Sequence, residues 1–555
     1  MKLKYNSLLI STCFFVLCLT SCKKYLDVNS SEAAPQDPSI SSVFPTQLAG
    51  IPRGLQYDAR YIGKYIQNFG VAGGTIPPWD NMGYDVSSDN GGDIWRMTYF
   101  GLGKNLNFII KKGIANNQWD YVGAAYALKA LSFQYVTDEC GPVIFTEAFP
   151  ADENIVTFHY DDQPVVYAGV DSLCRVALAY LSRTDLNTNQ KPLSAGDYAY
   201  NGNVNLWKKM VYGLMARNFH RITNKSDYRP DSVIKYCDLA MQTIGEDFVI
   251  PFDAAKNDDA NFAGVARSNY SLFRQSAYIV SLLDGTILTG QKGMVNRDPR
   301  IRHMLTCSGD TSGTGNGGYR GVAPGIIDPN YTTGNTNAKA VPFLWADSIS
   351  GNGASVLINK SPGAQGKYLF SNKAVLPIIT SAEIQFMKAE AAFLMGDKSL
   401  AYSCYKKGIG LHFDFINYQG WNKGNTALFL SNPITPVEKA NYLAGANVKQ
   451  SATSLTISDI MLQKYIALWG WGIFETWVDM RRYHYTDLDK DLADQNLQVY
   501  KNFTLPTLAS TNTGRPAYRV RPRYNSEYVW NLDELQKWGG VNTNYHTYEC
   551  WFSQQ

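Results

Sequence analysis

The stretch Ser458–Tyr485, SDIMLQKYIALWGWGIFETWVDMRRYHY, decides the fold of this chain. It opens on a helix-start signal, Ser458-Asp459, and apolar residues then recur at a spacing that predicts a helix with one buried side. These residues are Ile460, Tyr465, Ile466 and Trp469. Gly470 and Gly472 interrupt the pattern, and a glycine inside a helix costs about 1 kcal/mol relative to alanine. We therefore expect either a closely packed neighbour or a break followed by a second helix.

Charged residues and aromatics are mixed in the second half of the stretch. Asp479 and Arg482 are three residues apart and can pair on one helix face. Glu475 lies four residues before Asp479, so the two could instead serve as a glycosidase pair, with carboxyl groups about 5–5.5 Å or about 6.5–9.5 Å apart. We favour the structural interpretation, in which Glu475 pairs with Arg481 or Arg482 inside a buried seam.

Helical periodicity extends over much of the chain. Four helices are predicted between residues 120 and 240, and a capping box at Thr380 and Glu383 begins another, which Gly396 ends. The four are marked by apolar stripes at Ala124, Leu128, Leu131 and Tyr135, at Val166, Val170, Leu173, Ala177 and Tyr180, and at Trp207, Met210, Val211 and Leu214, and by a start at Asp231. Periodicity predicts a mainly α protein with stacked helix pairs, interrupted by long irregular insertions.

The N-terminus carries an export signal. Lys2 and Lys4 precede a twelve-residue apolar run, too short to span a bilayer but typical of a signal peptide, which ends at Leu19-Thr20-Ser21-Cys22. This ending resembles a lipobox, in which acyl chains such as palmitate anchor Cys22 to a membrane. We expect a signal peptide at residues 1–21, a lipidated tether at 22–45 and one domain at 46–555. No later stretch is apolar enough to span a bilayer, so we expect the lipid on Cys22 to be the only membrane anchor.

Segments spread from Cys22 to Asn531 resemble the SusD/RagB family. They are Cys22–Asp27, Gly103–Asn107, Asp138–Ala148, Asp298–Arg300 with Gly318, Tyr319 and Gly321, Ala382–Ala391, Gln463–Leu468 with Gly472, Glu475, Trp477, Asp479, Arg481 and Arg482, and Arg521–Asn531. The resemblance implies four tetratricopeptide-like units and an outer-membrane lipoprotein, expected at the cell surface. Such a protein binds an oligosaccharide, or in some relatives an oligopeptide, and delivers it to a SusC-like TonB-dependent transporter.

Composition excludes several other classes. The chain has 51 Lys and Arg against 48 Asp and Glu, and the expected signal peptide removes two lysines, which leaves a net charge of +1 and no electrostatic case for nucleic acid. The cysteines form no CxxC pair and the histidines are scattered, so we predict no metal site and no cofactor. Disulfide bonds are possible in an exported protein, and the sequence does not show which cysteines would pair. No G-x-S-x-G motif occurs, and the glycine-rich residues 313–318, expected to form a flexible surface loop, lack the Lys-Ser/Thr of a phosphate loop.

Aromatics in two irregular excursions, 70–92 and 285–371, are the remaining signal. A sugar ring has an apolar face, so flat aromatic rings with a few amide or charged neighbours suit glycan binding. We predict an exposed ligand platform built from Trp79, Asn81, Tyr84, Tyr319, Arg320, Trp345 and Asp347. The sequence leaves three hypotheses: a non-enzymatic nutrient-binding lipoprotein, which we favour, a glycan hydrolase, and a helical-repeat scaffold for proteins.

Overall fold

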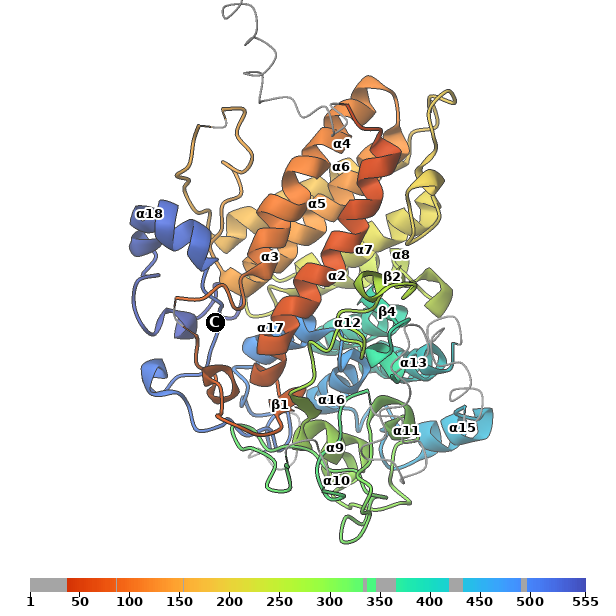
Figure 1. The fold of residues 1–555 in the computed structure, drawn as a ribbon. Coiled ribbons are helices and arrows are strands. Elements are labelled where there is room, and N and C mark those ends of the chain that lie inside the picture. Colours follow the sequence, from red (N-terminus) through yellow and green to blue (C-terminus); the bar gives the residue numbers. More distant parts are fainter. Residues whose placement is uncertain are drawn as a thin grey trace, which may run out of the picture.

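The computed structural model of the chain describes residues 37–85, 87–152, 154–332, 337–345, 366–418, 433–490 and 497–555. Over these residues the protein is a stack of helices with two small antiparallel sheets and long irregular segments at one end (Figure 1). The predicted mainly α fold with loop insertions is confirmed.

The helices have the following bounds. The longer ones are α2 (Ile40–Tyr65), α4 (Lys104–Ala115), α5 (Trp119–Cys140), α6 (Gln163–Leu181), α7 (Val204–His220), α8 (Pro230–Leu239), α12 (Ser381–Leu394), α13 (Lys398–Asn417), α15 (Pro436–Ala444), α16 (Ile457–Leu468) and α17 (Ile473–Arg482). The shorter ones are α3 (Asp93–Arg96), α9 (Ala277–Leu283), α10 (Thr286–Thr289), α11 (Ile301–Met304) and α18 (Leu532–Lys537), with π-helical η2 (Met97–Gly103) and η9 (Tyr524–Tyr528).

Consecutive helices pack as neighbours in a stack. Helix α4 packs on α5, α5 on α6, α6 on α7, α7 on α8, α8 on α12 and α12 on α13. Helix α2 lies along α4 and reaches helix α17 at its lower end in Figure 1. The four helices predicted from apolar stripes correspond to α5, α6, α7 and α8. Two sheets brace the irregular segments: β1 (Phe69–Val71) pairs with β3 (Phe273–Gln275), and β2 (Phe248–Pro251) with β4 (Val375–Ile379).

The stretch that decides the fold forms the centre of the molecule. It makes two helices, α16 and α17, and every residue of both is buried. The capping residue is Thr456, two positions earlier than predicted, and its hydroxyl forms a capping box with Asp459. The chain breaks at Trp469, and Gly470 has φ +86°, a left-handed conformation that favours glycine. The predicted break and restart are confirmed.

The structure differs from one boundary prediction and from one prediction on hydropathy. Helix α2 already begins at Ile40, so the helical domain includes residues before 46, and Pro45 lies inside that helix. The helix forms there because Ile40 and Phe44 bury their side chains in the core, and this burial outweighs the local cost of proline. Helix α6 is, by length and hydropathy, apolar enough to cross a membrane, contrary to expectation. It packs between α5 and α7, and Val166, Val170 and Ala177 are buried there.

The question of disulfides is answered for the described residues. Six cysteines there are buried, and none is in a disulfide: Cys140, Cys174, Cys237, Cys307, Cys404 and Cys550. Burial also raises the pKa of the Cys174 and Cys237 thiols. These cysteines therefore serve as small apolar core residues.

Candidate functional site

The aromatics predicted as a ligand platform are buried. Trp79 is 2% exposed and packs between Tyr65 and Tyr84, with ring centroids 5.4 and 4.7 Å away. Tyr319 and Trp345 are each 4% exposed, and Trp345 stacks on Phe343. The predicted exposed platform is therefore absent from the described residues. These rings fill the core under the loops because large aromatic surfaces gain most from leaving water.

The three polar residues predicted to accompany the aromatic rings do not form a common site in the described residues. Arg320 donates from Nη2 to the carbonyl of Ser312 at 2.9 Å, which ties down its own loop. Asp347 lies outside the described residues. Asn81 lies against Gly325, where an added Cβ would be 2.7 Å from its Oδ1. The two irregular excursions do meet, as the prediction required, but at Asn81 with Gly325 and at Gly73 with the Tyr331 ring, and not through the predicted aromatic residues.

The loop at 313–318 is also more ordered than predicted. The Asn316 side chain is buried and donates from Nδ2 to Asp284 Oδ2 at 2.9 Å and to the Tyr319 carbonyl at 3.0 Å. Several glycines there adopt positive φ, so the chain can turn tightly around this amide.

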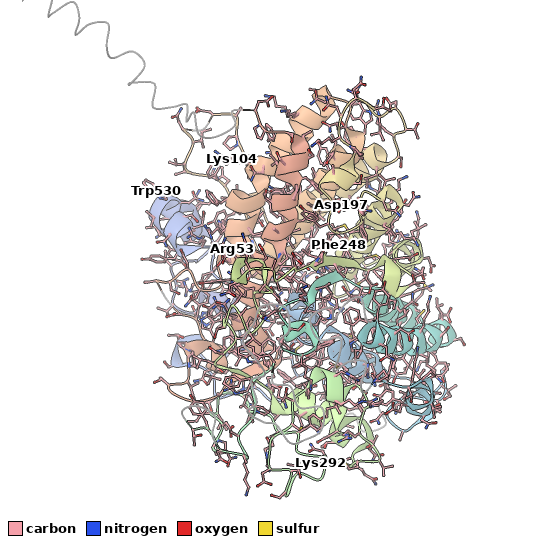
Figure 2. The ribbon with its side chains drawn as sticks, turned by 45° about the vertical axis from the view of Figure 1, so that its right-hand side comes forward. Arg53, Lys104, Asp197, Phe248, Lys292 and Trp530 are labelled. Atoms are coloured by element: carbon pink, nitrogen blue, oxygen red, sulfur yellow. The ribbon has the colours of Figure 1, made fainter. Side chains whose placement is uncertain are left out.

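A different part of the surface holds a groove of about 950 Å³, at the upper end of that expected for a small-ligand site. It lies between α3, η2 and α4 on one side and residues 523–530 on the other, with residues 144–158 closing one end. Trp530 is 63% exposed and Phe100 74% exposed, so both rings can be reached by a ligand. Figure 2 shows Trp530 and Lys104, two of its lining residues, on the same side of the molecule. The other aromatic lining residues are Trp95, Tyr99, Phe108, Phe149 and Phe158.

The local fold explains why aromatics line this groove. The π-helical segment η2 widens the helix between α3 and α4 and carries Tyr99 and Phe100 in succession. Tyr99 anchors the inner wall by donating from its hydroxyl to the carbonyl of Ile144 at 2.6 Å. Gly103 allows the Phe149 ring to lie directly on the helix, since an added Cβ would come within 1.9 Å of that ring. Phe100 is the next residue after Tyr99 and points outward.

Asn531 fixes the opposite wall. Its Nδ2 donates to the carbonyl of Phe158, and its Oδ1 accepts from the Phe158 backbone N–H, both at 3.0 Å. Glu527 accepts at Oε2 from the Tyr160 hydroxyl and from Asn531 Nδ2. Burial raises the pKa of the Glu527 carboxyl. The groove therefore has preformed walls, held by hydrogen bonds that no ligand needs to make.

Two smaller hollows continue along the same C-terminal segment. One, of about 260 Å³, lies between residues 84–88 and 521–543, and includes Arg521, Tyr524 and Tyr528. The other, of about 500 Å³, is formed by His159, Tyr160 and residues 534–538. Residues 521–543 thus border three hollows, which would allow an oligomer to extend beyond the main groove.

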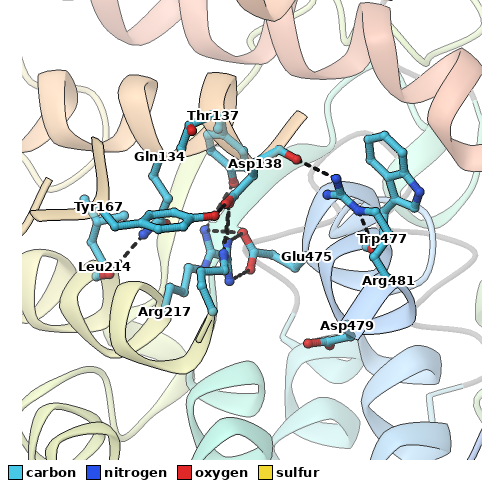
Figure 3. Close-up of polar contacts among 12 residues, drawn as sticks. Gln134, Thr137, Asp138, Tyr167, Leu214, Arg217, Glu475, Trp477, Asp479 and Arg481 are labelled. Atoms are coloured by element: carbon cyan, nitrogen blue, oxygen red, sulfur yellow. Dashed lines mark hydrogen bonds and ion pairs between the residues drawn. The ribbon is translucent and has the colours of Figure 1, made fainter. Parts of the chain in front are cut away.

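The carboxylates considered as a glycosidase pair are committed to structural ion pairs. Glu475 contacts Arg217 at 3.1 Å and Arg221 at 2.7 Å, rather than the predicted Arg481 or Arg482 (Figure 3). Burial alone would raise the pKa of Glu475, but these two guanidinium groups outweigh it and hold the pKa at about 2. Asp479 pairs with Arg482 at 2.6 Å, as predicted. Both carboxylates are buried, so they face guanidinium groups and not an open cleft.

One buried group has the composition of a metal site. Ligand atoms of His220, Glu390 and Asp479 lie within 4.8 Å of one another. Arg482 already pairs with both carboxylates, at 2.7 Å to Glu390 and 2.6 Å to Asp479. Lys464 adds a second cation 2.7 Å from Asp479. Two cationic side chains thus supply the positive charge that a metal would bring, so this cluster is an internal ion-pair network.

The sequence does contain an indication of the groove, in aromatic residues that do not fit the helical periodicity. Tyr99 and Phe100 are adjacent, so in a helix with a single buried side their side chains point in different directions and one of them can be left at the surface. Trp530 likewise lies outside any apolar stripe. The segment Arg521–Asn531 resembles the family pattern, but helical patterns do not show which distant segments it faces, so its role as a groove wall does not follow from the sequence.

The comparisons with known proteins agree with this fold. Residues 56–506 match a family described as "Starch-binding associating with outer membrane", SusD-like. A SusD/RagB protein from Bacteroides thetaiotaomicron superposes with a TM-score of 0.68 at 18% identity, covering 93% of this chain and 99% of that one. A protein described as chitin-binding superposes with a TM-score of 0.66 at 18% sequence identity, and the match covers 93% of this chain and 100% of that one. A chitin-binding SusD homologue from Flavobacterium johnsoniae superposes with a TM-score of 0.61 at 20% sequence identity, and the match covers 93% of this chain and 98% of that one. No curated protein matches this chain by sequence.

Proposed function

The chain belongs to the SusD/RagB family of outer-membrane-associated nutrient-binding proteins, and from this premise we propose that it captures an oligomeric glycan and delivers it to a SusC-like TonB-dependent transporter. We place it on the outer membrane, at the cell surface, held by lipid on Cys22. The proposal involves binding and transfer without a catalytic step.

The observation that carries the proposal is the groove between Phe100 and Trp530. Its walls are aromatic, two of its rings are largely exposed, and hydrogen bonds at Tyr99 and Asn531 hold it in shape. Stacking of sugar rings on exposed aromatics suits such a surface. A preformed wall also lowers the ordering cost of binding, because little has to become rigid when the ligand arrives.

The position of the groove relative to the tether supports delivery at the membrane. Lys112, in the last turn of α4, forms an ion pair with Asp37 and donates to the Pro38 carbonyl at 2.9 Å. Lys111, its neighbour, lines the groove. The described part of the chain therefore begins beside the groove, and a lipid on Cys22 would keep the groove near the membrane that holds the transporter.

The test of the binding site is Trp530→Ala. Truncating a central aromatic typically costs about 2 kcal/mol or more of binding, roughly thirtyfold in affinity. The side chain is 63% exposed, so thermal unfolding should stay within about two degrees. Calorimetry with the oligosaccharide found in a glycan-array screen measures the first effect, and differential scanning calorimetry the second.

Tyr198→Ala is the matched control, since Tyr198 is an aromatic residue that is 66% exposed but lines none of the three hollows. We expect its affinity to equal that of the unaltered protein. Equal affinity for Trp530→Ala would show that the ligand binds elsewhere. A peptide as the sole ligand found by array and peptide-pool screening would refute the glycan part of the proposal.

The anchor is tested with Cys22→Ala. Without the thiol that receives the lipid, the precursor should stay uncleaved or the protein should be released from the outer membrane. Membrane fractionation with detergent extraction measures this, and protease shaving of intact cells reports surface exposure. Cys174→Ala is the control, because Cys174 is a buried core residue and its loss should not change fractionation. A Cys22→Ala protein that still fractionates as a mature lipoprotein contradicts the proposed anchor.

A further inference from the structure

The polar lining of the groove is dominated by cations. Among the described residues that line it, Arg96, Lys104, Lys111 and Arg523 are cationic, and Glu527 is the one carboxylate. That carboxylate is buried and accepts hydrogen bonds from the protein itself. This excess of positive charge stands out in a chain whose expected mature net charge is only +1.

The positive charge extends beyond the rim. Four arginines lie close enough to Asp93 to act on its charge: Arg53, Arg60, Arg96 and Arg523. Arg96 is 3.8 Å from Asp93, and Arg523 is 2.6 Å from Asp89, so these two are partly balanced. Lys111 is exposed and has no ion-pair partner among the described carboxylates. Lys104 also has an interaction of its own. The described lining residues still carry more positive than negative charge, which favours anionic groups in the groove.

The hydrogen-bonding groups of the groove are mostly donors. Asn107 Oδ1 accepts from Lys129 Nζ at 2.9 Å, and Glu527 Oε2 is occupied by Tyr160 and Asn531. Arginine and lysine offer donors only. A neutral sugar presents hydroxyl groups, which need acceptors as well as donors. Carboxylate and sulfate groups need donors alone and form the stronger, charge-assisted bonds.

The same inventory distinguishes a glycan from an acidic peptide. A bound peptide would bring a backbone N–H at nearly every residue and would need acceptors for them. The amide of Asn107 and the carboxylate of Glu527 are already occupied, which leaves the Ser526 hydroxyl as an acceptor among the described lining side chains. The exposed rings of Phe100 and Trp530 offer flat surfaces for sugar faces instead.

We propose that the groove takes an acidic oligosaccharide, whose sugar units carry carboxylate or sulfate groups, in preference to a neutral one. The aromatic rings stack on the sugar faces, while Arg96, Lys104, Lys111 and Arg523 bind the acidic groups. This inference rests on the proposed glycan-binding function and narrows its ligand class.

The preference for acidic oligosaccharides is tested by measuring affinities of matched probes for the purified protein by calorimetry. Hexameric oligogalacturonate, alginate and chondroitin sulfate fragments are compared with maltohexaose, chitohexaose and fully methyl-esterified oligogalacturonate, which keeps the backbone but lacks the charge. A glutamate hexapeptide represents acidic peptides. We expect at least one acidic oligosaccharide to bind. Its affinity should fall steeply from about 0.1 M to about 1 M NaCl, as the Debye length shrinks from about 10 Å to about 3 Å.

The double variant Lys104→Gln/Lys111→Gln should weaken that binding about tenfold and flatten its salt dependence. Both lysines are exposed, so the fold should be unaffected. Lys256→Gln, an exposed lysine outside the groove, should change neither property. Lys104→Arg/Lys111→Arg should keep the affinity, because it keeps the charge.

The outcomes separate this inference from the function on which it rests. A neutral oligosaccharide that binds without salt dependence, and that Trp530→Ala weakens, overturns the acidic class but leaves glycan capture intact. Binding of the glutamate hexapeptide in place of every oligosaccharide overturns both. An acidic oligosaccharide whose affinity the double lysine variant leaves unchanged binds outside the groove, and also overturns the inference.

Discussion

Replacing Arg217 with methionine is expected to destabilise the protein by about 3–5 kcal/mol, since removing one partner of a buried ion pair leaves the others uncompensated. Arg217 is fully buried and donates from Nε and Nη2 to the two carboxylate oxygens of Glu383, both at 2.7 Å. Its Nη1 lies 3.1 Å from Glu475. The methionine variant would leave these two carboxylates facing each other with one cation fewer between them.

The charge count of the network explains why the arginine matters more than a carboxylate. Four cations and five carboxylates meet there, and burial lowers the pKa of His220 to about 4, which leaves it neutral. The cations are Arg217, Arg221, Lys464 and Arg482, and the carboxylates are Asp138, Glu383, Glu390, Glu475 and Asp479. The network therefore carries −1 when every carboxylate is ionised. Losing Arg217 takes it to −2, whereas Glu475→Gln takes it to zero.

Glu475→Gln is therefore the informative companion variant, and we expect it to cost less than Arg217→Met. The pKa of Glu475 is held at about 2, below its ordinary value of about 4.5. The stability that its charge contributes is fully present above pH 4.5 and is lost as the pH falls towards 2. Urea and thermal unfolding at pH 7 and pH 3 measure both effects. The gap between Glu475→Gln and the unaltered protein should shrink at pH 3.

Two results would contradict this account. If Arg217→Met unfolded at the midpoint of the unaltered protein, the network would not be the buried structural seam described here. If Glu475→Gln abolished turnover of a glycan while the unfolding midpoint stayed unchanged, Glu475 would be a catalytic residue and the binding function would have to be revised.

Trp79→Ala is expected to cost about 3–5 kcal/mol, the range for truncating a buried tryptophan. The ring is 2% exposed and packs on Tyr61, Tyr65 and Tyr84, with centroids 4.8, 5.4 and 4.7 Å away. Gly91 also closes over it, since an added Cβ there would lie 2.8 Å from the ring. The variant leaves a cavity that these neighbours cannot fill without moving α2. Differential scanning calorimetry should show a large drop in the unfolding temperature.

Trp530→Ala is the contrasting control for Trp79→Ala, because it removes the same side chain from an exposed wall of the groove. Trp79→Phe should recover most of the stability by keeping an aromatic ring in the cluster. Unchanged unfolding of Trp79→Ala combined with lost ligand binding would restore Trp79 as a ligand residue of an exposed platform and remove it from the core.

The sequence determined the helical frame because helix formation is local. Apolar stripes, caps and glycines placed α5, α6, α7 and α8, and the break at Gly470 within the stretch at 458–485. Each of these signals acts over a few residues, so it survives without knowledge of the rest of the chain. The resemblance to the SusD/RagB family rests on the same segments, and the family match over residues 56–506 agrees with it.

Only the tertiary structure decided which aromatics are inside and which charges meet. The prediction that Trp79, Tyr84, Tyr319 and Trp345 form an exposed platform rested on their place in irregular segments, yet all four are buried. A loop residue has no periodicity that reveals its exposure, since the surface covering it comes from segments far away in the sequence. Glu475 likewise pairs with Arg217 and Arg221, more than 250 positions away, and not with its sequence neighbours. Both the interior partners and the groove at Phe100 and Trp530 are products of long-range packing, which no local pattern encodes.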